Sequence, residues 1–404
     1  MWELIQANRR KSILLFVAMG MILILLGYIF GAAFLGDGGG VFGIFIAIIL
    51  WGILSLVSYF SGSKIILSIS NAKEVTKEVH PQLFNVVEEM TIAANLPKMP
   101  RIFIINDEAL NAFATGRKPE DSVVAVTAGL LSQLNRDELQ GVIAHEISHI
   151  VNRDVLFMTF AGIMLGAIVI MSEVFLRGYW LGGSSMNRYK NKSSGGGNAQ
   201  AVIMIAALVL AILAPILTRF LYFAISRKRE YLADANGARF TRYPEGLASA
   251  LEKLSQSKFN LRSANKAIAG LYIVNPLKKT GMKISDLSST HPPISERIRI
   301  LRGMMHGVNF TDYQNSYDKI KGGSEPIIPA SGLKLSESIP IRSEVEPSQN
   351  LTKKETQRKL GDIVMNVNKY KFYNCSCGVT IKIPPTYTND KIKCPRCGEV
   401  KIRD

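Results

Sequence analysis

Residues 135–151 read NRDELQGVIAHEISHIV, and this stretch decides how the chain around it folds. Asn135 is a strong helix N-cap, and Glu138 stands three residues later, where its side chain can bond back to the cap. Apolar residues then recur at the spacing of one helix face. The recurring positions are Leu139, Val142, Ile143, Ile150 and Val151. The pattern therefore predicts an amphipathic helix that begins at Asn135.

This predicted helix contains the motif His145-Glu-Ile-Ser-His149. Residues four apart share a helix face, so both imidazoles can reach one zinc ion at about 2.0–2.1 Å. Glu146 lies one residue round from that face. It can contact a water on the metal without being a ligand, which is the position of a catalytic base. The alternative is a pair of core histidines beside a surface glutamate, but a capped amphipathic helix is the context that the metal motif requires.

A catalytic zinc site needs a third protein ligand besides two histidines. Residues 226–237, SRKREYLADANG, can supply it. Glu230 and Asp234 are four apart on a predicted helix, so they share one face. We expect Glu230 to bind the metal and Asp234 to hydrogen-bond one of the ligand histidines.

The chain is long and apolar enough to combine a membrane part with a folded domain. It has 404 residues, 48% of them hydrophobic, and a mean hydropathy of +0.16, which excludes disorder as its overall state. Four stretches lack charge: 12–36, 38–63, 155–172 and 193–218. About 20 apolar residues span a bilayer as a helix. The sequence therefore predicts four spans, with the two metal-binding segments on either side of the second hairpin.

The distribution of basic residues predicts the orientation of these spans. Arg9, Arg10 and Lys11 precede the first span, which places the N-terminus and the catalytic segments in the cytoplasm. Four basic residues between 177 and 192 oppose this assignment. We keep it because residues 227–229 are basic at the inner end of the fourth span, and the N-terminal cluster usually dominates. The expected location is the cell membrane, with several passes.

Three short apolar runs precede the metal-binding helix, at residues 101–105, 111–115 and 122–127. Turn residues separate them, so they predict a small antiparallel sheet. An exposed edge strand can bind an extended peptide through main-chain hydrogen bonds. The alternative is an ordinary structural hairpin. The expected substrate-binding residues are Asn111, Ala112, Phe113 and Ala114.

All four cysteines lie near the C-terminus, which indicates a metal site in a reducing compartment. They are Cys375, Cys377, Cys394 and Cys397, and a glycine follows each pair. Paired knuckles of this kind predict a zinc ribbon with a second, structural zinc ion. The partner of the ribbon is not defined by its sequence. The net charge of +16 suits anionic lipid headgroups better than nucleic acid, because the basic segments adjoin predicted spans.

Taken together, these motifs resemble the HtpX family of membrane-bound zinc metalloproteases, of the HExxH…E gluzincin type. The wider group includes the CaaX prenyl proteases. The resemblance covers about residues 1 to 305 and adds two segments to the zinc motif: NAFATG at 111–116, and THPP at 290–293 with ERI at 296–298. It implies that His291 stabilises the oxyanion. Tyr231 is the other candidate for that role.

The expected fold is α+β: a multi-pass helical membrane protein with a cytoplasmic, mostly helical zinc-protease domain, a small antiparallel sheet and a C-terminal zinc ribbon. Its parts divide the chain in order. They are two transmembrane helices (1–63), the first protease segment (64–154), a transmembrane hairpin (155–225), the second protease segment (226–308), a linker (309–365) and the ribbon (366–404).

The expected function is zinc-dependent endopeptidase activity. The resemblance implies that the substrates are misfolded or damaged membrane proteins, taken as extended segments at the cytoplasmic face. Two alternatives remain at this stage. One is a CaaX-type protease that processes prenylated peptides, although four spans are few for that group. The other is a non-enzymatic membrane adaptor that acts through its ribbon, although the intact Glu146 argues for an enzyme.

Overall fold

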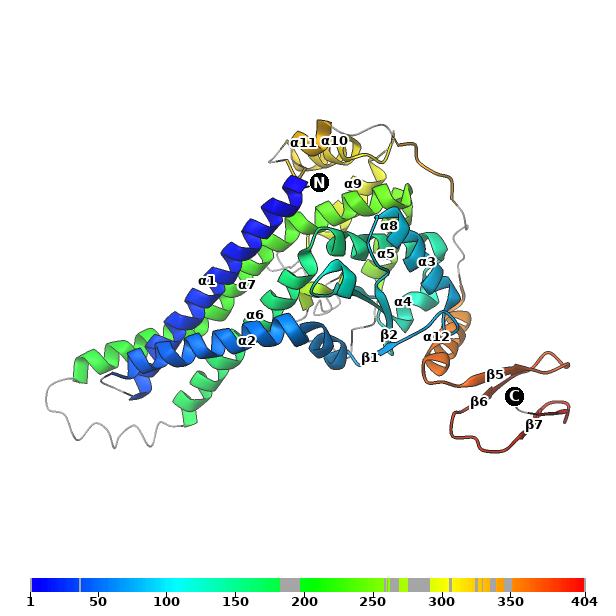
Figure 1. Ribbon diagram of the computed structural model, residues 1–404, viewed down its shortest axis with the longest axis horizontal. Helices are drawn as coiled ribbons and strands as arrows, with labels where there is room; N and C mark the ends of the chain where they lie inside the picture. The colour runs from blue at the N-terminus through cyan, green and yellow to red at the C-terminus, as the bar shows by residue number, and fades with distance from the viewer. Residues whose placement is uncertain are drawn as a thin grey trace.

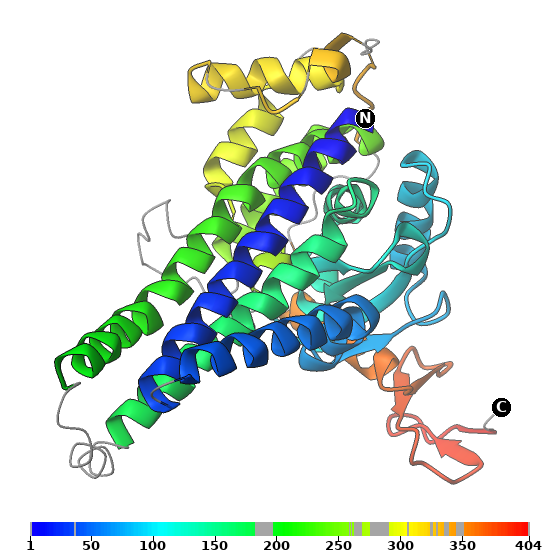
Figure 2. The same cartoon turned by 60° about the vertical axis from the view of Figure 1, so that its left-hand side comes forward.

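The computed structural model describes residues 2–35, 38–181, 197–257, 259, 261, 269–274, 291–304, 307–323, 326–328, 330–334, 339–344 and 351–402. Four long helices, α1 (Trp2–Leu35), α2 (Gly39–Ile69), α6 (Asp154–Leu181) and α7 (Gly197–Thr241), form an elongated bundle at one side of the molecule (Figure 1). Figure 2 shows α1 and α7 running side by side.

Three segments of these helices are long and apolar enough to cross a membrane: Ile13–Leu35, Gly39–Ile69 and Asp154–Arg177. The fourth predicted span corresponds to a shorter apolar stretch, Val202–Thr218. It belongs to α7, a single helix of 45 residues. The helix therefore continues without a break from this apolar stretch into the segment that carries Glu230 and Asp234.

Glycines bring α1 and α2 into close contact at one end. A Cβ atom on Gly27 would lie 2.5 Å from the carbonyl oxygen of Gly43, and one on Gly31 would lie 2.1 Å from that of Gly39. No larger residue fits such a contact, which is the reason small residues recur in membrane helix pairs. Away from this contact the two helices diverge, and α6 lies against both of them (Figure 1).

The domain beside this bundle contains a four-stranded sheet in the order β1-β2-β4-β3. Its strands are β1 (Ala72–Glu74), β2 (Arg101–Ile105), β3 (Ala112–Thr115) and β4 (Val123–Thr127). The three predicted strands are confirmed, but the expectation of an antiparallel sheet is wrong. β4 lies between β2 and β3. It pairs antiparallel with β3 and parallel with β2. β2, β3 and β4 are nearly continuous apolar runs, as expected for strands that are covered on both faces.

Helices cover both faces of this sheet. One face forms a large core with the helices of the domain, and the other face packs in a second core with residues of α1, α2 and α6. The metal-motif helix α5 (Arg136–Val151) is buried on nearly all sides, against α3 (Pro81–Ala93), α7 and α8 (Pro244–Gln256). The remaining elements of the domain are α4 (Ala128–Gln133), α9 (Ile294–Arg302) and the short 3-10 helices Pro119–Asp121 and Ala269–Leu271. Burial of this kind fixes α5 firmly, which a metal site on it requires.

The prediction of a linker over residues 309–365 is wrong. This stretch contains α10 (Phe310–Lys321), α11 (Ala330–Lys334) and α12 (Lys353–Val367). Phe310, Tyr313 and Tyr317 of α10 are buried in the main core, and Ile363 of α12 packs against it. The linker was predicted from the Pro, Ser and Gly residues between these helices. That prediction gave too little weight to the apolar residues that recur at helical spacing on either side.

The C-terminal residues form two β-hairpins, β5 (Lys371–Asn374) with β6 (Thr380–Ile383), and β7 (Lys391–Lys393) with β8 (Val400–Ile402). This unit follows α12 and lies across the catalytic domain from the outer ends of the long helices (Figure 1). α12 packs against α4, and Lys382 pairs with Asp362, so the hairpins are fastened to the domain.

Candidate metal centre

The local sequence explains why α5 begins where it does. The Asn135 side chain accepts a hydrogen bond from the Glu138 amide at 2.8 Å, and the Asn135 amide donates to the Glu138 carboxylate at 2.9 Å. This confirms the predicted capping box. A Cβ atom on Gly237 of α7 would lie 3.3 Å from the backbone nitrogen of His145, so a glycine lets α7 pass close to the metal motif.

α5 and α7 bring three metal-ligand residues together. The His149 Nε2 atom lies 3.4 Å from Glu230 Oε1, and the His145 Nε2 atom lies 3.6 Å from Glu230 Oε2. These separations are long for hydrogen bonds. They match the spacing of about 3.3–3.4 Å between two ligands held at about 2.0–2.1 Å from a tetrahedral zinc.

The donor set fits a zinc ion in a second respect. His145 Nε2 and Glu230 Oε2 are buried and have no hydrogen-bond partner among the described residues. Buried polar atoms are rarely left unpaired, because the cost is about 1–3 kcal/mol each. A cation between them would satisfy both. The predicted ligands His145, His149 and Glu230 are therefore brought together in an arrangement suited to zinc.

Each ligand histidine has a carboxylate on its other ring nitrogen. His145 Nδ1 lies 2.9 Å from Asp234 Oδ1, as predicted for Asp234, and His149 Nδ1 lies 3.3 Å from Asp154 Oδ2. These contacts fix the rings so that both Nε2 atoms face Glu230. Burial alone would lower the pKa of His149, but Asp154 and Glu230 raise it to about 10. Asp154 was not predicted from the sequence.

Arg297, on α9, contacts two acidic residues of the centre. Its guanidinium donates to both carboxylate oxygens of Asp234, at 2.8 and 2.7 Å, and lies 3.4 Å from Glu230 Oε2. Arg297 has no solvent exposure. Burial would raise the pKa of Asp234, but the charge and hydrogen bonds of Arg297, together with His145, outweigh it and the pKa is lowered. The sequence singled out the segment around Arg297 only through the family resemblance.

Glu146 is the unpartnered acid of the centre. Its side chain is buried, and neither carboxylate oxygen has a hydrogen-bond partner among the described residues. Burial raises the pKa of Glu146. A raised carboxyl pKa improves a general base, because the best catalytic pKa lies near the working pH. The geometry thus keeps Glu146 beside the metal ligands with both oxygens available.

The structure separates the two candidates for oxyanion stabilisation. The Tyr231 hydroxyl donates to Glu296 at 2.9 Å, so it is engaged away from the metal ligands. His291 is buried, and its Nε2 atom lies 3.7 Å from Glu230 Oε2. Burial lowers the pKa of His291 to about 4, so its imidazole is neutral near pH 7. A neutral imidazole can still donate one hydrogen bond.

The outer edge of β3 is paired with another part of the chain. The Ile273 amide donates to the Ala112 carbonyl at 3.0 Å, and Phe113 forms an antiparallel bridge with Tyr272. The Asn111 side chain donates to the Val274 carbonyl at 2.9 Å. The predicted edge strand therefore exists, but residues 272–274 already contact it through this bridge and these hydrogen bonds.

The four cysteines form a second cluster, between the two C-terminal hairpins. Their sulfur atoms lie within 4.8 Å of one another, with Cys375 3.4 Å from Cys397 and Cys377 3.7 Å from Cys394. Sulfur ligands of a tetrahedral zinc at about 2.3 Å would lie about 3.8 Å apart. The backbone amides of Cys397 and Arg396 lower the pKa of Cys394 to about 6, which favours the thiolate that binds metal.

Apolar helices long enough to cross a membrane, and an HExxH helix completed by a glutamate on a second helix, define a membrane zinc metalloprotease. The comparisons with known proteins agree. The chain matches Peptidase family M48 over residues 77–305. It therefore belongs to peptidase family M48, and within it to the HtpX proteases, as the following relatives show.

The curated relatives are similar over most of their length. A Protease HtpX homolog of Dictyoglomus thermophilum is 47% identical over 304 residues, which are 75% of this chain and 94% of that protein. One of Streptococcus uberis is 41% identical over 304 residues, 75% of this chain and 100% of that protein. These relatives favour the protease interpretation over both alternatives. A crystal structure of S. mikatae Ste24p aligns with a TM-score of 0.39 and 20% identity, over 74% of this chain and 67% of that one.

Proposed function

We propose that this metalloprotease holds its catalytic zinc with His145, His149 and Glu230 and uses Glu146 as its general base. Zinc, when bound there, supplies Lewis-acid activation of water and of the scissile carbonyl. Glu146 accepts the proton of the attacking water and delivers it to the leaving amine. The observation that carries this assignment is the convergence of three ligand atoms beside a buried, unpartnered carboxylate.

The other residues of the centre have supporting roles in this proposal. Asp234 and Asp154 orient the two ligand imidazoles, and Arg297 balances the charge of Asp234 and Glu230. His291 donates a hydrogen bond to the oxyanion that forms on the scissile carbonyl. Its burial beside Glu230 and its neutral state support this role.

The substrate in this proposal is an extended segment that pairs with β3. The chain's own residues 272–274 support this mode, because the Ile273 amide donates to the Ala112 carbonyl and Tyr272 forms an antiparallel bridge with Phe113. The Asn111 side chain adds a further contact to such a backbone. Main-chain pairing gives affinity with little dependence on side chains, which suits unfolded substrates of varied sequence.

Displacing residues 272–274 should therefore favour substrate binding. Ile273→Pro removes the amide that donates to Ala112, and the lost hydrogen bond is worth about 0.5–1.5 kcal/mol, or about 2–10-fold in equilibrium. We expect a rise of that size in kcat/KM for an unstructured peptide, relative to Ile273→Ala. The alanine variant is the control, because it loses the side chain and keeps the amide. Equal or lower activity of the proline variant would show that substrate does not compete for this edge.

The centre lies near the membrane in this proposal. His149 is five residues from Asp154, where α6 begins, and Glu230 is twelve residues after Thr218, about 18 Å along the helix. With the basic N-terminal cluster inside, both helices present the centre at the cytoplasmic face of the cell membrane, in a protein that crosses it several times. We propose misfolded or damaged membrane proteins as its substrates.

A tethered substrate tests this location. The protein, reconstituted in liposomes, is given an unfolded segment either anchored by a transmembrane helix or free in solution. We expect faster cleavage of the anchored segment, because tethering raises its effective concentration to about the millimolar range. The measurement is the initial rate at equal total concentration. Equal rates for both forms would refute a site that works at the membrane surface.

We also propose that Cys375, Cys377, Cys394 and Cys397 hold a structural zinc ion, so that each chain binds two. Changing Cys394 and Cys397 to serine should remove one zinc per chain and leave peptide cleavage within about 2-fold of wild type, because a tetrathiolate site has no open position for substrate. Metal analysis together with a peptide assay measures both. One zinc in the wild-type protein would contradict the two-site assignment.

A further inference from the structure

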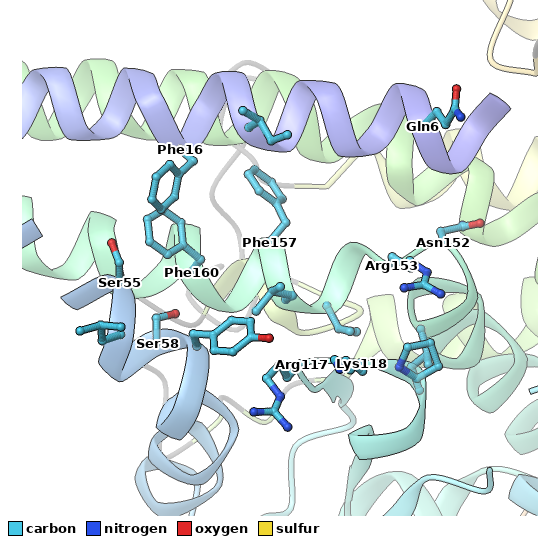
Figure 3. Close-up of a pocket in the computed structure, with 17 residues that line it drawn as sticks. Gln6, Phe16, Ser55, Ser58, Arg117, Lys118, Asn152, Arg153, Phe157 and Phe160 are labelled. Atoms are coloured by element: carbon cyan, nitrogen blue, oxygen red, sulfur yellow. The ribbon is translucent and has the colours of Figure 1, made fainter. Parts of the chain in front are cut away.

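A cavity separate from the metal centre opens between the diverging ends of α1 and α2. Its volume is about 820 Å³, and α6 and the turn after β3 complete its wall. Figure 3 shows Phe16 and Phe160 at one end, and Gln6, Asn152 and Arg153 at the other. The first end is therefore mostly aromatic, with the hydroxyls of Ser55 and Ser58 beside the rings, and the other end is polar.

The charge of the lining has one sign. It contains Arg117, Lys118 and Arg153 and no acidic residue. Arg117 pairs with Asp121 at 2.9 Å and lies over the ring of Tyr59. Lys118 and Arg153 are exposed and have no ion-pair partner in the part of the chain that the structure describes. The polar end thus has two cations available to an anion.

Buried polar groups in the lining also lack partners. Asn152 Nδ2 and the Ser58 hydroxyl have no hydrogen-bond partner among the described residues, although Asn152 is 3% exposed and Ser58 2%. Both residues line the cavity. An unsatisfied buried donor costs about 1–3 kcal/mol, so a ligand that supplies acceptors would stabilise the protein.

The position of the cavity along the helices matches the surface of a bilayer. The apolar segment of α1 begins at Ile13, so Gln6 lies seven residues outside it and Phe16 lies within it. Arg153 immediately precedes α6, and Phe160 lies in its second turn. With these segments in a bilayer, the end that holds Gln6, Asn152 and Arg153 would face the headgroups, and the end that holds Phe16 and Phe160 would face the hydrocarbon.

We propose that this cavity binds an anionic phospholipid. Its phosphate lies between Lys118 and Arg153, its ester oxygens accept from Asn152, and an acyl chain packs against Phe16, Phe157 and Phe160. A volume of about 820 Å³ is within the range of small-ligand sites, about 300–1,000 Å³. A spanning protein helix, about 10 Å across and 30 Å long, would displace on the order of 2,000 Å³ and does not fit.

Native mass spectrometry of the full-length protein in mild detergent tests the proposal, with phosphatidylglycerol and phosphatidylcholine of equal chain length as probes. We expect preferential retention of phosphatidylglycerol. Each basic residue near a headgroup is worth about 5-fold in affinity, so Lys118→Gln with Arg153→Gln should weaken phosphatidylglycerol binding about 30-fold. The matched control is Arg10→Gln with Lys64→Gln, which removes two exposed charges near the same membrane surface but outside the cavity.

A second variant keeps every charge and fills the apolar end. Ser55→Phe should abolish retention of phosphatidylglycerol, because the new ring occupies the space of the acyl chain. Equal retention of the two lipids, an equal loss in the matched control, or full retention in both cavity variants would overturn the proposal. Displacement of the lipid by millimolar inorganic phosphate, or by a peptide spanning helix, would also overturn it, because the occupant would then be a free anion or a protein.

Discussion

Glu146→Ala should lose peptide cleavage by about 10²–10⁴-fold while it keeps its catalytic zinc, since this is the range that a positioned general base contributes. The separation of the two effects follows from the geometry. The metal-ligand cluster consists of His145, His149 and Glu230, whereas both oxygens of Glu146 are unpartnered beside it. The measurement is the initial rate on an unfolded protein substrate, together with zinc content after dialysis.

The near-isosteric Glu146→Gln keeps the volume of the side chain and should lose activity to the same extent. Glu88→Gln, at an exposed position of α3, is the matched control and should retain full activity. Substantial turnover in both Glu146 variants would refute the assigned base. Loss of zinc along with activity would place Glu146 among the metal ligands instead.

The parts of the centre that could be predicted from the sequence are those that belong to a local helical pattern. Asn135 and Glu138 form the predicted cap, and His145 and His149 share a face because a helix repeats every 3.6 residues. Glu230 was placed by the same periodicity and by the need for a third ligand. These inferences depend only on the geometry of a helix, and the local amino-acid sequence strongly determines where a helix forms.

Asp154 and Arg297 could not be placed in this way. Asp154 contacts His149 because the chain turns after α5, where Arg153 has a positive φ of 59°, and α6 then starts with Asp154 close to the histidine. A signal existed: a ligand histidine almost always has an orienting partner, and Asp234 alone could serve only one of two histidines. Arg297 is 63 residues from Asp234, and no local pattern connects them.

The order of the strands and the helices within residues 309–365 could not be predicted, for a related reason. Strand positions along the chain did not show that β4 enters the sheet between β2 and β3. Tyr313 and Tyr317 are buried because α9 and α7 provide a surface for α10, and such a surface is absent from any local window of sequence. Tertiary packing therefore decided both features.

The last prediction separates Glu230 from Asp234, the two acids that face the metal motif from α7. Glu230→Ala leaves two histidines, too few for a site that needs three protein ligands. Catalytic zinc should be lost, and added zinc should restore little activity. Asp234→Asn leaves all three ligands in place with His145 less firmly oriented. Such changes weaken metal affinity or activity about 10–100-fold, so added zinc should restore activity in part.

Arg297 adds a second consequence for Asp234→Asn. The buried guanidinium loses its charged partner, and breaking a buried ion pair costs about 3–5 kcal/mol of folding stability. The double variant Asp234→Asn with Arg297→Gln removes the stranded charge. We expect it to recover much of the thermal stability while its zinc affinity stays low, because the orientation of His145 is still impaired. Proteolysis against free zinc, and thermal unfolding of all three variants, provide the comparison. If Asp234→Asn cannot be rescued and Glu230→Ala behaves like wild type, Asp234 is the third ligand, and Glu230 contacts the two histidines for another reason.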